Sequence, residues 1–276
     1  MIPLVTSING LLTSLFGLLV WPFQGSDPLW PILFVSLLTG ILMLWIFGKV
    51  SNQDAILRIK TKIWGNLLGV RLFQHDVRIV LRLQGRILRD TVTYLRYSTI
   101  PMLVLIVPVM LIIVQLNLHF SLRPLEPGVP TVLVVRLTEP SVLEEKILLQ
   151  TPAGVRVETP AVRIESLNEI SWRIRAEQPG QYPLTVQVGE ETIQKELSVG
   201  QGWRAVSALR TNSLLGLLLY PGEAPIPSSY TVESIEVKYR PLQISIWGWK
   251  VHWLVLFFLL SIVFGFVFKG VLGVEL

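Results

Sequence analysis

The stretch that decides the fold is residues 29–47, LWPILFVSLLTGILMLWIF, in which no Asp, Glu, Lys or Arg occurs. A helix needs roughly 20 mostly apolar residues to cross the hydrocarbon core of a bilayer. Two further stretches meet the same requirement, residues 100–118 (IPMLVLIVPVMLIIVQLNL) and residues 251–268 (VHWLVLFFLLSIVFGFVF). The sequence therefore predicts an α-helical membrane protein with a bundle of three spans.

The composition agrees with a membrane as the solvent. Of the 276 residues, 51% are hydrophobic and only 16% are charged, and the mean hydropathy is +0.56. These values are too apolar for an ordinary water-soluble domain. The chain has no cysteine, which excludes a disulfide framework, a thiolate metal site and a thiol nucleophile.

The distribution of charge predicts the orientation of the spans. Residues 49–98 carry ten Lys and Arg against three Asp, and loops rich in Lys and Arg remain in the cytoplasm. Alternation then places residues 120–246 outside. We expect the spans at residues 27–48, 99–119 and 247–276, the last with a short cytoplasmic tail. Three tryptophans fall where an outer interfacial belt is expected, and they are Trp247, Trp249 and Trp253.

The N-terminal segment, residues 1–26, predicts an amphipathic helix on the outer membrane surface. Between residues 4 and 20, apolar side chains recur at helical spacing, but Ser, Thr, Asn and Gly interrupt them. A narrow apolar stripe with a polar opposite face is typical of an interfacial helix. A fourth span is the alternative, and it would leave the later topology unchanged.

Residues 49–98 predict a basic cytoplasmic helical hairpin. Ser51 and Asp54 resemble a capping box at the start of a first helix, and Asp76 follows a turn at residues 73–75 as the cap of a second helix. The second helix carries four arginines at steps of four, four and three, which places them on one face. These arginines are Arg78, Arg82, Arg86 and Arg89.

This arginine face has two interpretations. Juxtamembrane loops are basic because orientation and anionic lipids favour cations there, each by about 1 kcal/mol. Alternatively, the hairpin docks on an acidic partner, such as ribosomal RNA or a nascent chain, through phosphate contacts. The sequence leaves both open.

Residues 120–246 predict an extracytoplasmic all-β domain. Short runs with period-two alternation and regular turns indicate an antiparallel, immunoglobulin-like sandwich. Trp172 is an expected core residue, and Tyr182 after Pro179-Gly180 resembles a tyrosine corner. The expected strands are 131–137, 146–150, 155–158, 161–165, 170–175, 182–188, 192–199 and 232–239. For the apolar run at residues 214–219, a buried strand is favoured over a short membrane-surface helix.

No motif for catalysis, for a cofactor or for a metal is present in the sequence. The three histidines are far apart in sequence, and no phosphate-binding glycine loop or GxSxG occurs. The spans contain only mild polarity, at Ser36, Thr39, Gln115, Asn117 and Ser261. Such residues usually serve helix packing. The alternative is that they line a shallow polar groove that shelters polar segments in transit.

The order of these parts resembles the YidC/Oxa insertase superfamily, particularly its compact archaeal members and the third subunit of the ER membrane protein complex. The resemblance covers roughly residues 4–120 and 245–274. It is carried by Ile8 to Val20, by Phe47-Gly48-Lys49 with Ser51-Asn52-Gln53-Asp54, by YSTIPMLVLIVP at 97–108, by Trp247-Gly248-Trp249, and by residues 261–274. Unlike bacterial insertases of this type, the chain has no arginine within a span, and its β domain is an insertion.

The resemblance implies a membrane-protein insertase or chaperone of the inner (plasma) membrane that needs no covalent chemistry and is not an enzyme. Its partners would be the lipid bilayer and nascent membrane proteins or the ribosome, and not DNA. The alternative is an anchored envelope protein whose external β-sandwich binds another protein.

Overall fold

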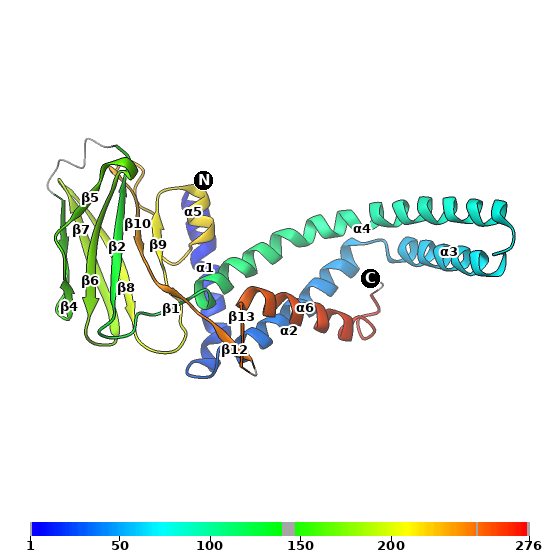
Figure 1. Cartoon of the computed structure of the whole chain (residues 1–276), viewed down its shortest axis with the longest axis horizontal. Helices are drawn as coiled ribbons and strands as arrows, with labels where there is room; N and C mark the ends of the chain where they lie inside the picture. Colours follow the sequence, from blue (N-terminus) through cyan, green and yellow to red (C-terminus); the bar gives the residue numbers. More distant parts are fainter. Residues whose placement is uncertain (1, 140–146, 247, 275–276) are drawn as a thin grey trace. The chain divides into compact units, whose positions relative to one another are not determined.

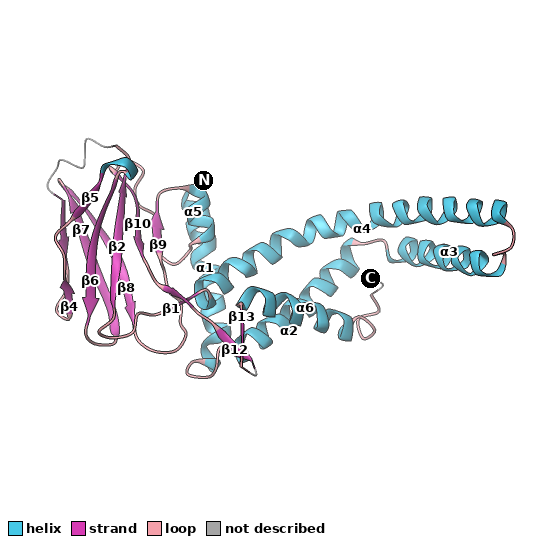
Figure 2. Cartoon of the chain, in the orientation of Figure 1, coloured by secondary structure: helices cyan, strands magenta, loops and turns pink. Residues whose placement is uncertain are grey.

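A computed structural model describes residues 2–139, 147–246 and 248–274 of the chain. The chain divides into two compact units. The helical unit comprises Ile32–Leu111 and Leu254–Leu276, and the β unit comprises Met1–Pro31 and Ile112–Trp253. The described strands, labelled in Figure 1 and drawn in magenta in Figure 2, all fall within the residue range of the β unit. Trp247 of the expected belt and Lys146 of an expected strand lie outside the described residues.

The long helices confirm a membrane-embedded protein at the level of length and composition. Three segments are long and apolar enough to cross a bilayer: Val5–Phe23, Leu29–Val50 and Val77–Phe120. Two of them, α2 (Leu29–Val50) and α4 (Val77–Phe120), contain the apolar runs 29–47 and 100–118 of the first two predicted spans. The third predicted span is the shorter helix α6 (Trp253–Phe268) of 16 residues, which at 1.5 Å per residue covers about 24 Å.

The hairpin in the helical unit is present, but one of its predicted caps is wrong. Helix α3 (Gln53–Leu72) begins at Asn52, whose side chain accepts a hydrogen bond from the Ala55 amide. Ser51 does not cap it, because the Ser51 hydroxyl donates back to the Phe47 carbonyl at 2.6 Å. Asp76 caps α4 as predicted, since its carboxylate accepts from the Arg78 and Ile79 amides.

Helix α4 is continuous across the predicted boundary between hairpin and span. Its 44 residues run through Pro101 and Pro108, and at 1.5 Å per residue they extend about 66 Å. Since the hydrocarbon core is about 30 Å thick, roughly half of α4 lies beyond any single crossing. The arginine face and the second span therefore belong to one helix.

The β unit contains two antiparallel sheets around one hydrophobic core, which confirms the predicted β domain. One sheet has the order β4-β6-β2-β10-β9 with β5 beside β6, and the other has the order β3-β7-β8. The first sheet comprises β2 (Pro130–Leu137), β4 (Val155–Val157), β5 (Val162–Ile164), β6 (Glu169–Ala176), β9 (Leu209–Thr211) and β10 (Val232–Val237). The second comprises β3 (Ile147–Gln150), β7 (Gly180–Val188) and β8 (Glu191–Val199). Two short pairs complete the unit, β1 (Leu122–Arg123) with β11 (Arg240–Pro241) and β12 (Ile244–Ile246) with β13 (Trp249–Val251).

Alternation along the strands builds this core. In β2 every second side chain is buried, and Leu133, Val135 and Leu137 are at most 1% exposed. Trp172 is in the core as predicted. The Tyr182 hydroxyl donates to the Gln178 carbonyl four residues upstream at 3.0 Å, which is the hydrogen bond that a tyrosine corner requires.

The prediction of a strand at residues 214–219 is wrong. This run forms the short helix α5 (Leu214–Leu219), capped by Ser213, whose hydroxyl accepts from the Gly216 amide at 3.0 Å. The run has no period-two alternation, and a Cβ atom on Gly216 would lie 2.3 Å from Thr211 Cγ2. A local cap and a close approach therefore set the structure here.

The N-terminal helix α1 (Ile2–Val20) is amphipathic within the β unit and is followed by the 3-10 turn η1 (Trp21–Phe23). On one side, Asn9 Nδ2 donates to the Leu217 carbonyl at 2.8 Å, and Thr13 Oγ1 accepts from Gln115 Nε2 at 3.2 Å. The opposite side presents an exposed apolar stripe of Ile8, Leu11, Leu15 and Leu18.

Candidate functional site

The helical unit contains an apolar groove formed by α2, α4 and α6, with a volume of about 260 Å³. Thr39 and Ser261 are the only residues with polar side chains among those that line it. The other lining residues are Gly40, Met43, Leu44, Phe47, Leu105, Val109, Phe257, Phe258, Ile262, Gly265 and Phe266. We call this the α2–α4–α6 groove.

The close approach of α2 to α6 depends on small side chains. A Cβ atom on Gly40 would lie 2.9 Å from the Ser261 carbonyl oxygen and 3.1 Å from Phe264 Cβ. Each helix carries a pair of small residues four apart, Ser36 with Gly40 and Ser261 with Gly265. Small residues at this spacing let two helix backbones pack closely in a membrane.

The structure brings together only part of the predicted polar groove. Thr39 and Ser261 line the groove, while Ser36 is fully buried and does not. Thr39 satisfies its hydroxyl locally by donating to the Val35 carbonyl at 2.7 Å. Gln115 and Asn117 belong to the β unit, where Gln115 is buried and bonded to Thr13. The polar groove of five residues is therefore reduced to two, in an apolar setting.

Helix α4 presents three different faces along the hairpin. One face lies against α3, where a Cβ atom on Gly69 would lie 2.9 Å from Leu83 Cδ1 and Asn66 is bonded to Asp90 at 3.4 Å. A second face carries the predicted arginines, all exposed: Arg78, Arg82, Arg86 and Arg89. The third face is apolar and also exposed, and it was not predicted from the sequence. It consists of Val77, Leu81, Leu88, Val92 and Leu95.

Most of the arginine face is free of protein anions. Arg89 makes one long contact with Asp90, at 3.8 Å. Among the described residues, Arg78, Arg82 and Arg86 have no ion pair. Three guanidinium groups on one helix face are thus available to anions from outside the chain.

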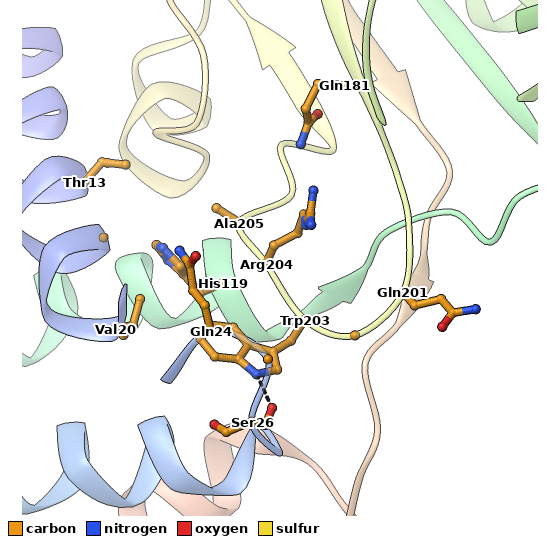
Figure 3. A pocket seen from close by; sticks show the side chains of 13 residues that line it. Thr13, Val20, Gln24, Ser26, His119, Gln181, Gln201, Trp203, Arg204 and Ala205 are labelled. Carbon is orange, nitrogen blue, oxygen red and sulfur yellow. Dashed lines mark hydrogen bonds between the residues drawn. The ribbon is translucent and has the colours of Figure 1, made fainter. Parts of the chain in front are cut away.

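The β unit contains a larger cavity, of about 640 Å³, which the sequence did not predict. Figure 3 shows its walls: α1, the turn after η1, the end of α4, the start of β7 and the loop at residues 201–205. The loop is held by Trp203, whose indole N–H donates to the Ser26 carbonyl at 2.8 Å and whose ring packs on Phe120. Segments far apart in sequence meet here, so no local motif marks the site.

Among the described residues that line this cavity, Arg204 is the only Asp, Glu, Lys or Arg. Its side chain extends toward Gln181 (Figure 3). The Gln181 carbonyl oxygen accepts from the Ser198 hydroxyl at 2.7 Å, so the Gln181 NH₂ group is left as a donor. Within the described part of the chain, the Arg204 guanidinium has no hydrogen bond or ion pair. We call this the Arg204 cavity.

Among the described residues, no cluster of three or more His, Asp or Glu side chains could hold a metal ion. Comparison with protein-family models and with curated proteins gives no match for this chain.

Proposed function

We propose that the chain is an insertase or chaperone for other membrane proteins, located in the inner (plasma) membrane and acting without covalent chemistry. The observation that carries this proposal is the α2–α4–α6 groove, which is apolar apart from Thr39 and Ser261. Apolar segments in a bilayer associate by close packing against such surfaces.

The size of the groove limits what it can hold. Pockets for drug-sized molecules measure about 300–1,000 Å³, so a groove of about 260 Å³ holds a few apolar side chains. A client helix would lie along the groove and insert side chains from one of its faces. This proposal replaces the polar shelter expected from the sequence with an apolar docking surface.

The hairpin would receive the client in the cytoplasm. Its exposed arginine face suits the phosphates of ribosomal RNA or of anionic lipids, and the neighbouring apolar face suits a hydrophobic segment that has left the ribosome. Because α4 is one helix from Val77 to Phe120, the same element carries both faces and one wall of the groove.

In this proposal the β domain, an immunoglobulin-like sandwich, is extracytoplasmic. Helix α1 would lie on the outer leaflet rather than cross the bilayer. The inner side of α1 contacts residues of the β unit at Asn9, Thr13 and Phe16, so only the stripe from Ile8 to Leu18 is left to face lipid. Such one-sided exposure supports an interfacial helix.

Cysteine crosslinking tests the groove directly, because the chain contains no cysteine of its own. Met43→Cys and Ile262→Cys place a thiol in the groove, while Leu42→Cys and Leu259→Cys place one on exposed positions of the same helices outside it. A newly made single-span protein with one cysteine in its apolar segment should form disulfides with the first pair only. Equal crosslinking at all four positions, or none at the groove pair, would refute the proposal.

The alternative function is that of an anchored envelope protein that binds an external partner. Substitution of the arginine face distinguishes this function from that of an insertase. Replacing Arg78, Arg82, Arg86 and Arg89 with Gln should lower the levels of client membrane proteins in quantitative membrane proteomics. Replacing the same four with Lys preserves the charge and is the matched control for orientation. Unchanged client levels in the Gln variant would favour the anchor.

A further inference from the structure

We propose that the Arg204 cavity binds the phosphodiester headgroup of a glycerophospholipid. The site belongs to the β unit and does not depend on the proposed insertase activity. The proposal rests on the hydrogen-bond donors in the cavity and on the lack of Asp and Glu among its described lining residues. It also rests on the open space along α1, which forms one wall of the cavity.

Arg204 and Gln181 present hydrogen-bond donors to the cavity. A guanidinium group has five N–H donors and no acceptor, and a glutamine NH₂ group is also donor-only. Figure 3 shows Arg204 extending toward Gln181, whose side-chain Oε1 accepts a hydrogen bond from the Ser198 hydroxyl. Both side chains are exposed, so these donors are open to an acceptor from outside the chain. A phosphate group, with several acceptor oxygens and a negative charge, satisfies both and matches the fork of the guanidinium.

The charge of the cavity lining is positive. No Asp or Glu is among the residues that line the cavity, and Arg204 supplies the positive charge. The remaining polar side chains in the lining include Gln24 and Gln201, whose amides can donate to phosphate or glycerol oxygens. An acid-free pocket with one unpaired cation favours an anion over a cation or a neutral sugar.

Helix α1 provides an apolar surface next to the cavity. Gly17 and Val20 of α1 line the cavity, and a Cβ atom on Gly17 would meet nothing within 4 Å. The cavity is therefore open along α1 beside Leu18, which is 74% exposed. The segment Val5–Phe23 is apolar enough to contact a bilayer. A lipid with its headgroup in the cavity would thus place its acyl chains along the apolar stripe of α1.

Two variants with matched controls test the site. Arg204→Gln removes the cation, and Arg240→Gln is its control, because Arg240 is exposed in the same unit and has no ion pair among the described residues. Gly17→Leu fills the cavity without a change of charge, and Gly10→Leu is its control, because Gly10 also has open space around its Cβ position and lies outside the lining. Leucine favours a helix more than glycine does, so neither leucine variant should unfold α1.

The experiment is native mass spectrometry of the full chain in nonionic detergent, titrated with dihexanoyl phosphatidylglycerol. We expect one retained lipid in the wild type and in both controls, and binding weaker by roughly tenfold or more in Arg204→Gln and Gly17→Leu. A second arm uses glycerophosphoglycerol, which has the same phosphodiester without acyl chains. Binding of both compounds would identify a soluble phosphodiester as sufficient, whereas binding of the lipid alone would identify a lipid site. Failure of the wild type to retain either compound, or equal retention by Arg204→Gln, would overturn the proposal.

Discussion

Replacing Lys195 with methionine tests what a buried charge contributes to the β unit. Lys195 lies in β8 at a position that faces the interior, and its side chain is 0% exposed. Its ammonium group donates to the Ser207 carbonyl at 2.7 Å and forms an ion pair with Glu223. Burial lowers the pKa of Lys195, and the carboxylate of Glu223 opposes that shift. The pair connects β8 to the segment before β10.

The expected cost follows from the group that is left behind. Lys195→Met leaves the Glu223 side chain, 8% exposed, without its cation, and breaking a buried pair from one side costs roughly 3–5 kcal/mol. For a domain of this size, 1 kcal/mol lowers Tm by roughly 2–4 °C. The single variant should therefore unfold roughly 6–20 °C lower. The double variant Lys195→Met with Glu223→Leu removes both charges and should recover most of that loss.

Scanning calorimetry of the full chain in detergent gives Tm, and hydrogen exchange of β8 localises the change. Arg173→Met is the control, because Arg173 and Glu158 form a pair at 2.9 Å with 53% and 25% exposed side chains. Exposed pairs contribute about 0–1 kcal/mol, so this variant should shift Tm little. The reasoning is refuted if Lys195→Met matches Arg173→Met, or if the double variant is less stable than Lys195→Met.

Two further predictions concern close packing and pH. Gly40→Ala should weaken the packing of α2 on α6, because its Cβ would lie 2.9 Å from the Ser261 carbonyl oxygen. Gly265→Ala should be tolerated, because a Cβ at that position has open space. Thermal unfolding of the two variants measures the difference in stability, and equal stability would contradict the prediction. Tyr239→Phe should cost about 1–3 kcal/mol, because the Tyr239 hydroxyl accepts from the Ser198 amide at 2.9 Å and its loss leaves that donor unpaired. Burial raises the pKa of the Tyr239 hydroxyl, so above about pH 10 the unfolded chain releases this proton while the folded chain keeps it. The free energy of unfolding of the wild type should then fall by up to about 1.4 kcal/mol per pH unit relative to that of Tyr239→Phe. Denaturant titrations from pH 7 to 11 measure both free energies. A constant difference between the two proteins over this range would refute the raised pKa of Tyr239.

Features with a strong local period were predictable from the sequence. The strand β2 was expected at 131–137 and is observed at Pro130–Leu137, because period-two alternation over eight residues has few competing interpretations. The start of α4 was predictable for another local reason, because Asp is one of the residue types that cap helix N-termini and Asp76 stands at that position. Trp172 could be assigned to the core because Trp side chains are mostly buried on average, and Tyr182 could be assigned because it follows a Pro-Gly turn as in a tyrosine corner.

Features that depend on tertiary contacts were not predictable. The run at 214–219 is apolar throughout, and its helical structure follows from the Ser213 cap and from the space that Thr211 leaves at Gly216. Gln115 was expected in a membrane groove, but its partner Thr13 is 102 residues away in the sequence. The Arg204 cavity draws its walls from five segments, so no spacing rule could have revealed it.

The two prolines of α4 have a consequence for the groove that they border. A proline inside a helix removes one backbone hydrogen bond and favours bending there. Pro101 and Pro108 are seven residues apart, which places them on nearly the same helix face, and the groove residues Leu105 and Val109 lie between and just after them. The wall that α4 contributes thus lies in a stretch of the helix where two backbone N–H donors are missing. On the opposite wall, Gly40 holds α2 against α6 at close contact. A guest larger than about 260 Å³ would therefore displace α4 before it separated α2 from α6.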